Sequence, residues 1–126
     1  MREYTKLLLV DDEPALRDLL KTYLNMAGYN DIDIANDGEL ALDMINSSDY
    51  DAILMDTNMP GRNGFEICSQ IRRFNNSIGI FGMSGNDYAR EWIDSGANHF
   101  IPKLSIINKS EREKLYQSID KVVNSN

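Results

Sequence analysis

Acidic, hydroxyl and amine side chains follow four short apolar runs in this sequence. The set consists of Asp11 and Asp12 after residues 6–10, Asp56 after 52–55, Ser84 after 78–83, and Lys103 after 100–101. Each member has an ordinary structural explanation when it is taken alone: aspartates favour the first turn of a helix, a serine caps a turn, and a lysine is usually solvated. Their shared place at the ends of apolar runs favours a common chemical role.

The chemistry that fits this set is phosphoryl transfer to a carboxylate. Clustered carboxylates repel one another and favour a divalent cation, and ligands that are all oxygen favour Mg²⁺ over zinc. The metal and the ammonium of Lys103 would neutralise the oxygens of an incoming phosphoryl group. Asp56 is the candidate nucleophile, because a carboxylate can form an acyl phosphate, and Ser84 is a candidate hydroxyl donor to that phosphate.

The apolar runs and the segments between them predict an α/β fold. Short, continuous apolar runs indicate strands that are covered on both faces, and residues 32–35 supply a fifth run. The segments between the runs carry helical patterns, with Pro14 near the start of the first and Gly28 at its end. We expect five βα units that form a doubly wound parallel sheet, with the reactive residues at the carboxyl ends of the strands.

Three helices carry more specific expectations. The third has an apolar stripe that extends to Phe74, and the fifth should begin with a capping box at Ser110. The fourth should be short or displaced, because it has to fit between Asn86 and Ser95. We expect Trp92 on that helix to be either half-buried core or an anchor for a partner.

Composition and charge narrow the class of protein further. The 126 residues suffice for one core, so we predict a single domain over residues 1–126. Thirteen basic against twenty acidic residues give a net charge of -7, which argues against direct nucleic-acid binding. The single cysteine, Cys68, suits a reducing compartment, and no run has the length of a membrane span or the pattern of a signal peptide. We expect a cytoplasmic protein.

Four ordered motifs carry a resemblance to a known family. LLVDDE, MDTNMPGRNG, FGMSG and GANHFIPK resemble the receiver domain of two-component response regulators, and the likeness covers essentially the whole chain. The resemblance implies a flavodoxin-like fold with strand order 2-1-3-4-5. It also implies that Asp56 accepts a phosphoryl group from a phosphohistidine of a sensor histidine kinase or a histidine phosphotransfer protein.

The resemblance also implies roles for the other site residues. Asp12, Asp56 and the backbone carbonyl of Asn58 would bind Mg²⁺ directly, and Asp11 would act mainly through water. Ser84 and Lys103 would contact the phosphate, and Phe100 would occupy an aromatic switch position that responds to Ser84. The protein would catalyse its own phosphorylation and slow dephosphorylation without being an enzyme in the usual sense. It would act on an unknown downstream protein as a monomer or weak dimer, through the face of helix 4, strand 5 and helix 5.

The sequence departs from the family pattern in one region. Members usually have Lys-Pro at the end of strand five, preceded by a longer fourth helix, whereas this chain has Pro102-Lys103-Leu104. A cis peptide before Leu104 would be costly, so we expect a trans bond there. Pro102 is tolerable because strand five lies at the edge of the sheet. His99 is expected on the surface, and Cys68 in the core.

Two other functions remain open from the sequence. One is a receiver-like scaffold that signals without phosphorylation, which the altered fourth helix makes conceivable. The other is a phosphatase with a covalent aspartyl phosphate. Haloacid-dehalogenase-type phosphatases place a second acid two residues after the nucleophile, and Asn58 stands there in this chain.

Overall fold

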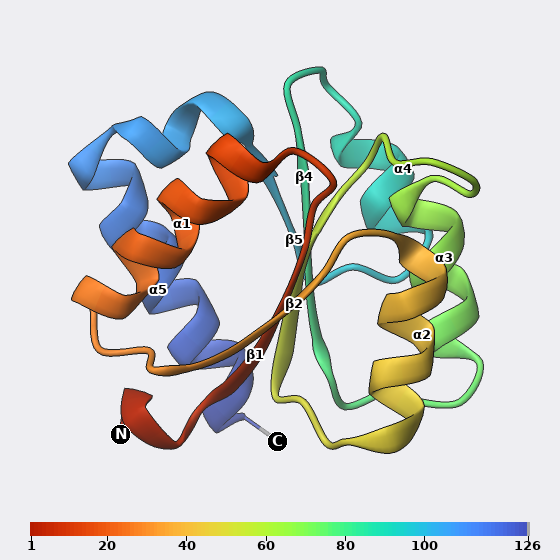
Figure 1. Cartoon of the computed structure of the whole chain (residues 1–126), viewed down its shortest axis with the longest axis horizontal. Helices are drawn as coiled ribbons and strands as arrows, with labels where there is room; N and C mark the ends of the chain where they lie inside the picture. Colours follow the sequence, from red (N-terminus) through yellow and green to blue (C-terminus); the bar gives the residue numbers. More distant parts are fainter. Residues whose placement is uncertain (126) are drawn as a thin grey trace.

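The computed structural model of the protein describes residues 1–125. Its centre is a sheet of five parallel strands in the order β2-β1-β3-β4-β5 (Figure 1). The strands are β1 (Lys6–Val10), β2 (Asp31–Ala35), β3 (Ala52–Asp56), β4 (Gly79–Ser84) and β5 (His99–Pro102). The helices are α1 (Pro14–Met26), α2 (Gly38–Ser47), α3 (Gly64–Arg72), α4 (Ala89–Asp94) and α5 (Lys109–Asn124), with 3-10 helices at Arg2–Tyr4 and Lys103–Ile107. The predicted doubly wound fold and its strand order are confirmed.

Helices cover both faces of the sheet. α1 and α5 lie on one face, and α2, α3 and α4 lie on the other (Figure 1). Alternate side chains of β1 enter two separate cores: Leu7 and Leu9 pack on the side of α1 and α5, while Leu8 and Val10 pack on the opposite side. β3 is buried along its whole length, which explains the continuous apolar run that precedes Asp56.

The parallel register brings the carboxyl ends of the strands to one edge. Asp56 of β3 pairs with Met83 of β4, and the next residue of β4, Ser84, pairs with Pro102 of β5. β1 pairs with β3 up to Val10. The loops that follow the strands therefore lie together, at the top of Figure 1, and the N-terminus lies at the bottom.

Two helix ends differ from the sequence prediction. α5 begins at Lys109, and the side chain of Asn108 accepts a hydrogen bond from the backbone N–H of Glu111 at 3.0 Å. The predicted cap at Ser110 is wrong because Asn108, which caps a helix as well as serine does, already has the extended backbone that a cap requires. Phe74 lies beyond the end of α3 and is 51% exposed, so its predicted place on the apolar stripe is also wrong.

The short helix α4 differs from the sequence prediction in the burial of Trp92. It is short, as predicted, with six residues, but Trp92 is 0% exposed, so the half-buried side chain and the surface anchor are both wrong. The indole fits because two glycines leave room for it. A Cβ at Gly82 would lie 2.1 Å from Trp92 Cδ2, and a Cβ at Gly64 would lie 2.6 Å from Trp92 Cζ2.

β5 and the segment after it follow expectation. β5 is an edge strand, which accommodates Pro102. Residues 1–125 contain no cis peptide bond, so the trans geometry predicted before Leu104 is confirmed. Cys68 is buried in the core and His99 is exposed, also as predicted.

Candidate functional site

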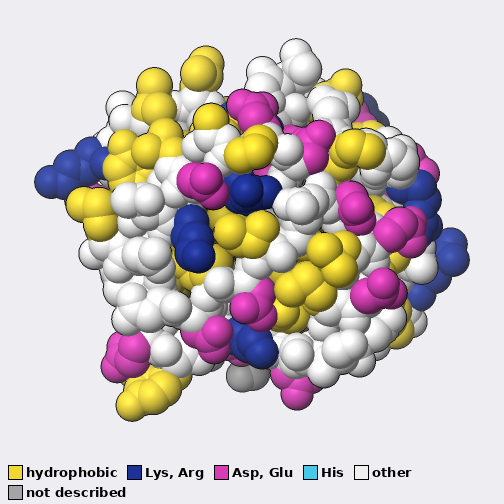
Figure 2. Space-filling view, viewed as in Figure 1, with side chains coloured by type: hydrophobic (Ala, Val, Ile, Leu, Met, Phe, Trp, Pro, Cys, Tyr) yellow, Lys and Arg dark blue, Asp and Glu magenta, His cyan; other side chains and the backbone are white. Residues whose placement is uncertain are grey.

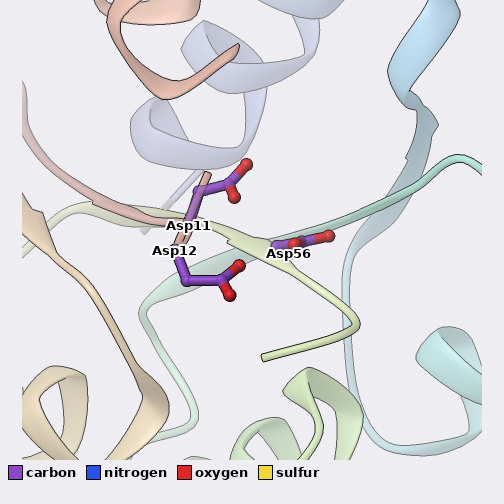
Figure 3. Close-up of side chains that lie close together, drawn as sticks. All are labelled: Asp11, Asp12 and Asp56. Carbon is purple, nitrogen blue, oxygen red and sulfur yellow. The ribbon is translucent and has the colours of Figure 1, made fainter. Parts of the chain in front are cut away.

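Three carboxylates from two neighbouring strands meet at the carboxyl edge of the sheet. Asp11 and Asp12 directly follow β1, and Asp56 is the last residue of β3. One oxygen atom of each lies within 4.8 Å of the others, and Figure 3 shows the three side chains pointing to the same side. Asp11 and Asp56 are buried, whereas Asp12 is exposed. The structure thus brings together residues that lie far apart in the sequence.

Lys103 brings a positive charge to these carboxylates. Its Nζ lies 3.0 Å from Asp56 Oδ1 and 3.5 Å from Asp11 Oδ2, and its side chain is 16% exposed. Lys103 is the first residue of the 3-10 helix after β5, and from that position its side chain reaches β3, two strands away. The order Pro-Lys therefore does not prevent Lys103 from reaching the carboxylate of Asp56.

The surroundings of Asp56 change its acidity. Burial raises the pKa of the Asp56 carboxyl to about 6, and the charge of Asp11 adds to this shift, while Lys103 and the N–H of Thr57 oppose it. Burial lowers the pKa of Lys103, but the hydrogen bond to Asp56 and the charges of Asp11 and Asp56 outweigh it, so the pKa is raised overall. An acid that ionises near neutral pH beside a protonated lysine is more typical of a functional site than of a surface turn.

Thr57 holds the Asp56 side chain, and sequence reasoning missed it. The Thr57 backbone N–H donates to Asp56 Oδ1 at 2.8 Å, and the Thr57 hydroxyl donates to the carbonyl of Met83 at 2.7 Å. The same hydroxyl accepts a hydrogen bond from the indole N–H of Trp92 at 2.7 Å. The one signal in the sequence was a hydroxyl directly after a buried strand, which is also ordinary in a turn.

The other predicted residues lie around this cluster. Ser84 is buried at the end of β4, and its Oγ accepts a hydrogen bond from the backbone N–H of Asn86 at 3.0 Å. Phe100 on β5 is half-buried and lines a small cavity together with Ser84 and Pro102. Asn58 is exposed in the loop after β3, two residues after Asp56.

The donor set of this site fits a hard divalent cation. Three carboxylates against one ammonium leave an excess of two negative formal charges. The cluster consists of aspartates alone, which suits Mg²⁺ rather than zinc, and the exposure of Asp12 leaves room for the waters that Mg²⁺ retains.

On the face shown in Figure 2, acidic side chains are interspersed with basic ones, and no large basic patch is visible. Within residues 1–125, every helix falls short of the length and apolar character that crossing a membrane requires.

A five-stranded parallel sheet of this order, with clustered aspartates and a lysine at its carboxyl edge, defines the class of CheY-like folds with a phosphoacceptor-type pocket. Comparison with known proteins identifies the family within this class. The family model "Response regulator receiver domain" matches residues 7–119. The chain therefore belongs to the receiver domains of two-component response regulators, a family of phosphoacceptors.

Curated relatives contain this domain within longer proteins. The chain is 42% identical over 120 residues to the sensor protein EvgS of Escherichia coli O157:H7, which covers 91% of the chain and 10% of EvgS. It is 37% identical over 101 residues to the response regulator MprA of Mycobacterium avium, which covers 78% of the chain and 44% of MprA. The chain thus spans less than half the length of these relatives.

Solved structures agree with the family. The response regulator TrrA of Thermotoga maritima, in complex with Mg²⁺ and BeF, has a TM-score of 0.80 and 34% identity, over 90% of this chain and 98% of that one. The chemotaxis response regulator CheY4 of Vibrio cholerae has a TM-score of 0.78 and 28% identity, over 91% of this chain and 98% of that one.

Proposed function

We propose that the protein is a switch that is activated by phosphorylation of Asp56. The phosphoryl donor is a phosphohistidine of a sensor histidine kinase or a histidine phosphotransfer protein. The observation that carries the proposal is the buried Asp56 carboxylate with Lys103 Nζ at 3.0 Å and two further aspartates beside it. A solvated turn residue would need none of these neighbours.

The transfer needs an ionised carboxylate and a means of neutralising the phosphoryl oxygens. An oxygen of Asp56 attacks phosphorus, the bond from phosphorus to the donor nitrogen breaks, and its electron pair stays on the imidazole. The product is an acyl phosphate on Asp56. Lys103 already contacts Asp56, so its ammonium lies where charge on the phosphoryl group has to be balanced.

Mg²⁺ is the cofactor that the aspartates fit. Asp12, Asp56 and the carbonyl of Asn58 would hold it, with Asp11 acting through water. The bound ion supplies positive charge to the phosphoryl oxygens. The TrrA structure contains Mg²⁺ and BeF, which supports the same cofactor in a related protein.

The switch itself would use Ser84 and Phe100. The Ser84 hydroxyl would move to donate to the phosphate, and the space it leaves in the cavity beside Phe100 would allow that ring to move inward. Differential contacts of the phosphate with the two arrangements shift the population. The altered face of α4, β5 and α5 would then bind a downstream protein. The side chains of Asn58 and Asn86 would tune the lifetime of the phosphate by their effect on attacking water.

The setting of this switch is also part of the proposal. We place the protein in the cytoplasm, where sensor kinases present their phosphohistidines, and we assign it as a monomer or weak dimer. Relatives named as a sensor protein and as a response regulator are consistent with a two-component pathway.

Intact-mass measurement tests the proposal. Incubation with Mg²⁺ and acetyl phosphate should add one phosphoryl group to the wild type and to a control variant, Asp43→Asn, whose aspartate is exposed on α2. Asp56→Asn should remain unmodified. Absence of the adduct on the wild type would favour the scaffold that signals without phosphorylation, and an adduct on Asp56→Asn would move the phosphoacceptor elsewhere.

A further inference from the structure

Trp92 contacts the phosphoacceptor strand in a way that the proposed function does not use. It is the single tryptophan of the chain, and it is 0% exposed although it comes from a helix of six residues. Its ring meets the ring of Phe65 edge-on, with 6.2 Å between the centroids. Burial alone would be explained by a packing role in the core. The indole N–H of Trp92, however, also has a specific hydrogen-bond partner, Thr57.

A chain of hydrogen bonds leads from this indole to the site. The N–H of Trp92 donates to Thr57 Oγ1 at 2.7 Å, and the Thr57 hydroxyl donates to the Met83 carbonyl at 2.7 Å. The backbone N–H of Thr57 reaches both Met83 O at 3.0 Å and Asp56 Oδ1 at 2.8 Å. Thr57 is therefore held by α4 on one side and by β4 on the other, and it in turn holds the Asp56 carboxylate.

Close packing fixes the same residues sterically. A Cβ at Gly64 would lie 2.2 Å from the backbone oxygen of Asp56 and 2.6 Å from Trp92 Cζ2. The indole, the start of α3 and the end of β3 thus fill one small volume. Gly82 is a costly residue for the interior of a buried strand, and its lack of a side chain is what admits the ring.

We propose that Trp92 is a positioning residue for phosphoryl transfer to Asp56, acting through Thr57; this inference rests on the proposed function. With the Thr57 hydroxyl fixed, the Thr57 N–H stays aimed at Asp56 Oδ1, the oxygen that Lys103 also contacts. The carboxylate plane is then set, and Oδ2 is the oxygen left to attack phosphorus. Without the indole N–H, the Thr57 hydroxyl keeps only its bond to the Met83 carbonyl, so Thr57 is held from one side and the carboxylate samples unproductive orientations.

Four variants separate this role from simple packing. Thr57→Val keeps the shape of the side chain but removes its hydroxyl, and Trp92→Phe removes the indole N–H. Thr57→Ser restores the hydroxyl without the methyl group. Tyr29→Phe is the matched control, because it deletes another buried hydroxyl with two partners, Asp120 and the carbonyl of Tyr116, in the core on the opposite face of the sheet.

The readout is the rate of adduct formation with acetyl phosphate and Mg²⁺, measured against donor concentration. We expect Thr57→Val and Trp92→Phe to lower the rate at saturating donor about tenfold, with an unchanged KM, as removal of an outer partner of a ligating carboxylate does. Thr57→Ser and Tyr29→Phe should stay within about twofold of the wild type. The indole N–H resonance should shift in Thr57→Val and be retained in Thr57→Ser.

Equal rates for wild type, Thr57→Val and Trp92→Phe would overturn the positioning role. A comparable loss in Tyr29→Phe would also overturn it, because general destabilisation would then explain the effect. Should Thr57→Val fail to fold, the rate of Trp92→Phe decides alone. Failure of the wild type to form any adduct would instead contradict the proposed function, so the two failures are distinguishable.

Discussion

The neighbours of Asp56 have opposing effects on the pKa of its carboxyl group. Burial and the charge of Asp11 favour the protonated acid, whereas the contacts with Lys103 and the Thr57 N–H favour the carboxylate that a nucleophile must be. The negative charge of the Asp56 carboxylate is therefore balanced only when a cation lies near it. This balance supports Asp56, among the many acids of the chain, as the proposed phosphoacceptor.

The first prediction concerns stability against pH in the absence of divalent cations. In the unfolded chain Asp56 ionises near pH 3.8, whereas in the folded protein it keeps its proton until about pH 6. The stability from protonated Asp56 is fully present below about pH 4 and is lost as the pH rises to 6. Asp56→Asn does not ionise, so its advantage over the wild type should grow across this range, by at most about 3 kcal/mol for roughly two pKa units.

Urea unfolding at pH 4 and pH 7 measures this difference. Asp43→Asn, at an exposed position, serves as the control for the effect of an aspartate-to-asparagine change as such. An Asp56→Asn advantage that stays constant or shrinks between these pH values would contradict the raised pKa.

The second prediction concerns Lys103. Lys103→Met removes an ammonium that lies 3.0 and 3.5 Å from two carboxylates, so Mg²⁺ should bind more tightly, because a competing cation is gone. The phosphorylation rate should nevertheless fall about 100-fold, because charge on the phosphoryl group loses its partner. Calorimetry and intact mass give the two quantities. Lys114→Met, at a largely exposed position, should change neither; weaker Mg²⁺ binding in Lys103→Met would contradict the account.

At the scale of elements, the start of a helix depends on which of several nearby polar side chains caps its free backbone N–H groups. Asn108 caps the N-terminus of α5, because its side chain accepts a hydrogen bond from the backbone N–H of Glu111. We predict that Asn108→Ala destabilises the protein by about 1 kcal/mol, the usual loss for a cap, whereas Ser110→Ala changes stability by a few tenths of a kcal/mol. Thermal unfolding compares the two, and a larger loss for Ser110→Ala would restore the capping box that the sequence suggested.

The strands were predictable because parallel strands buried on both faces must be apolar throughout. From the sequence alone, that constraint places Asp56 and Ser84 at strand ends, and right-handed crossovers then bring them to one edge of the sheet. The position of Trp92 was not predictable, because it depends on Gly64 and Gly82, which lie on other elements. For the same reason the role of Thr57 was missed: its partners Trp92 and Met83 meet it only in the folded chain.

At the scale of the molecule, the residues that stabilise the fold and the residues of the candidate site lie at different parts of the sheet. The two cores lie on its faces, whereas the charged cluster lies at its carboxyl edge, where loops from β1, β3 and β5 meet. Clustered negative charge at that edge is unfavourable without a cation. The folded protein therefore gains stability from any ion that binds there and does not bind the unfolded chain.

Mg²⁺ should accordingly raise the unfolding midpoint of the wild type. A concentration 100 times the dissociation constant would add about 2.7 kcal/mol. Asp12→Asn should lose most of this gain, because it removes one of the three carboxylates, while Asp43→Asn should keep it. Thermal unfolding at matched ionic strength makes the measurement. Equal gains in wild type and Asp12→Asn would show that Mg²⁺ acts elsewhere.

The central claim is that Asp56 carries an acyl phosphate. Borohydride reduces an aspartyl phosphate to homoserine, so treatment of the phosphorylated protein marks the modified residue, and peptide mass spectrometry locates it. The account predicts homoserine at position 56 after incubation with Mg²⁺ and acetyl phosphate, and none when Mg²⁺ is chelated. Homoserine at another aspartate, or a phosphoryl group that borohydride leaves in place, would contradict it.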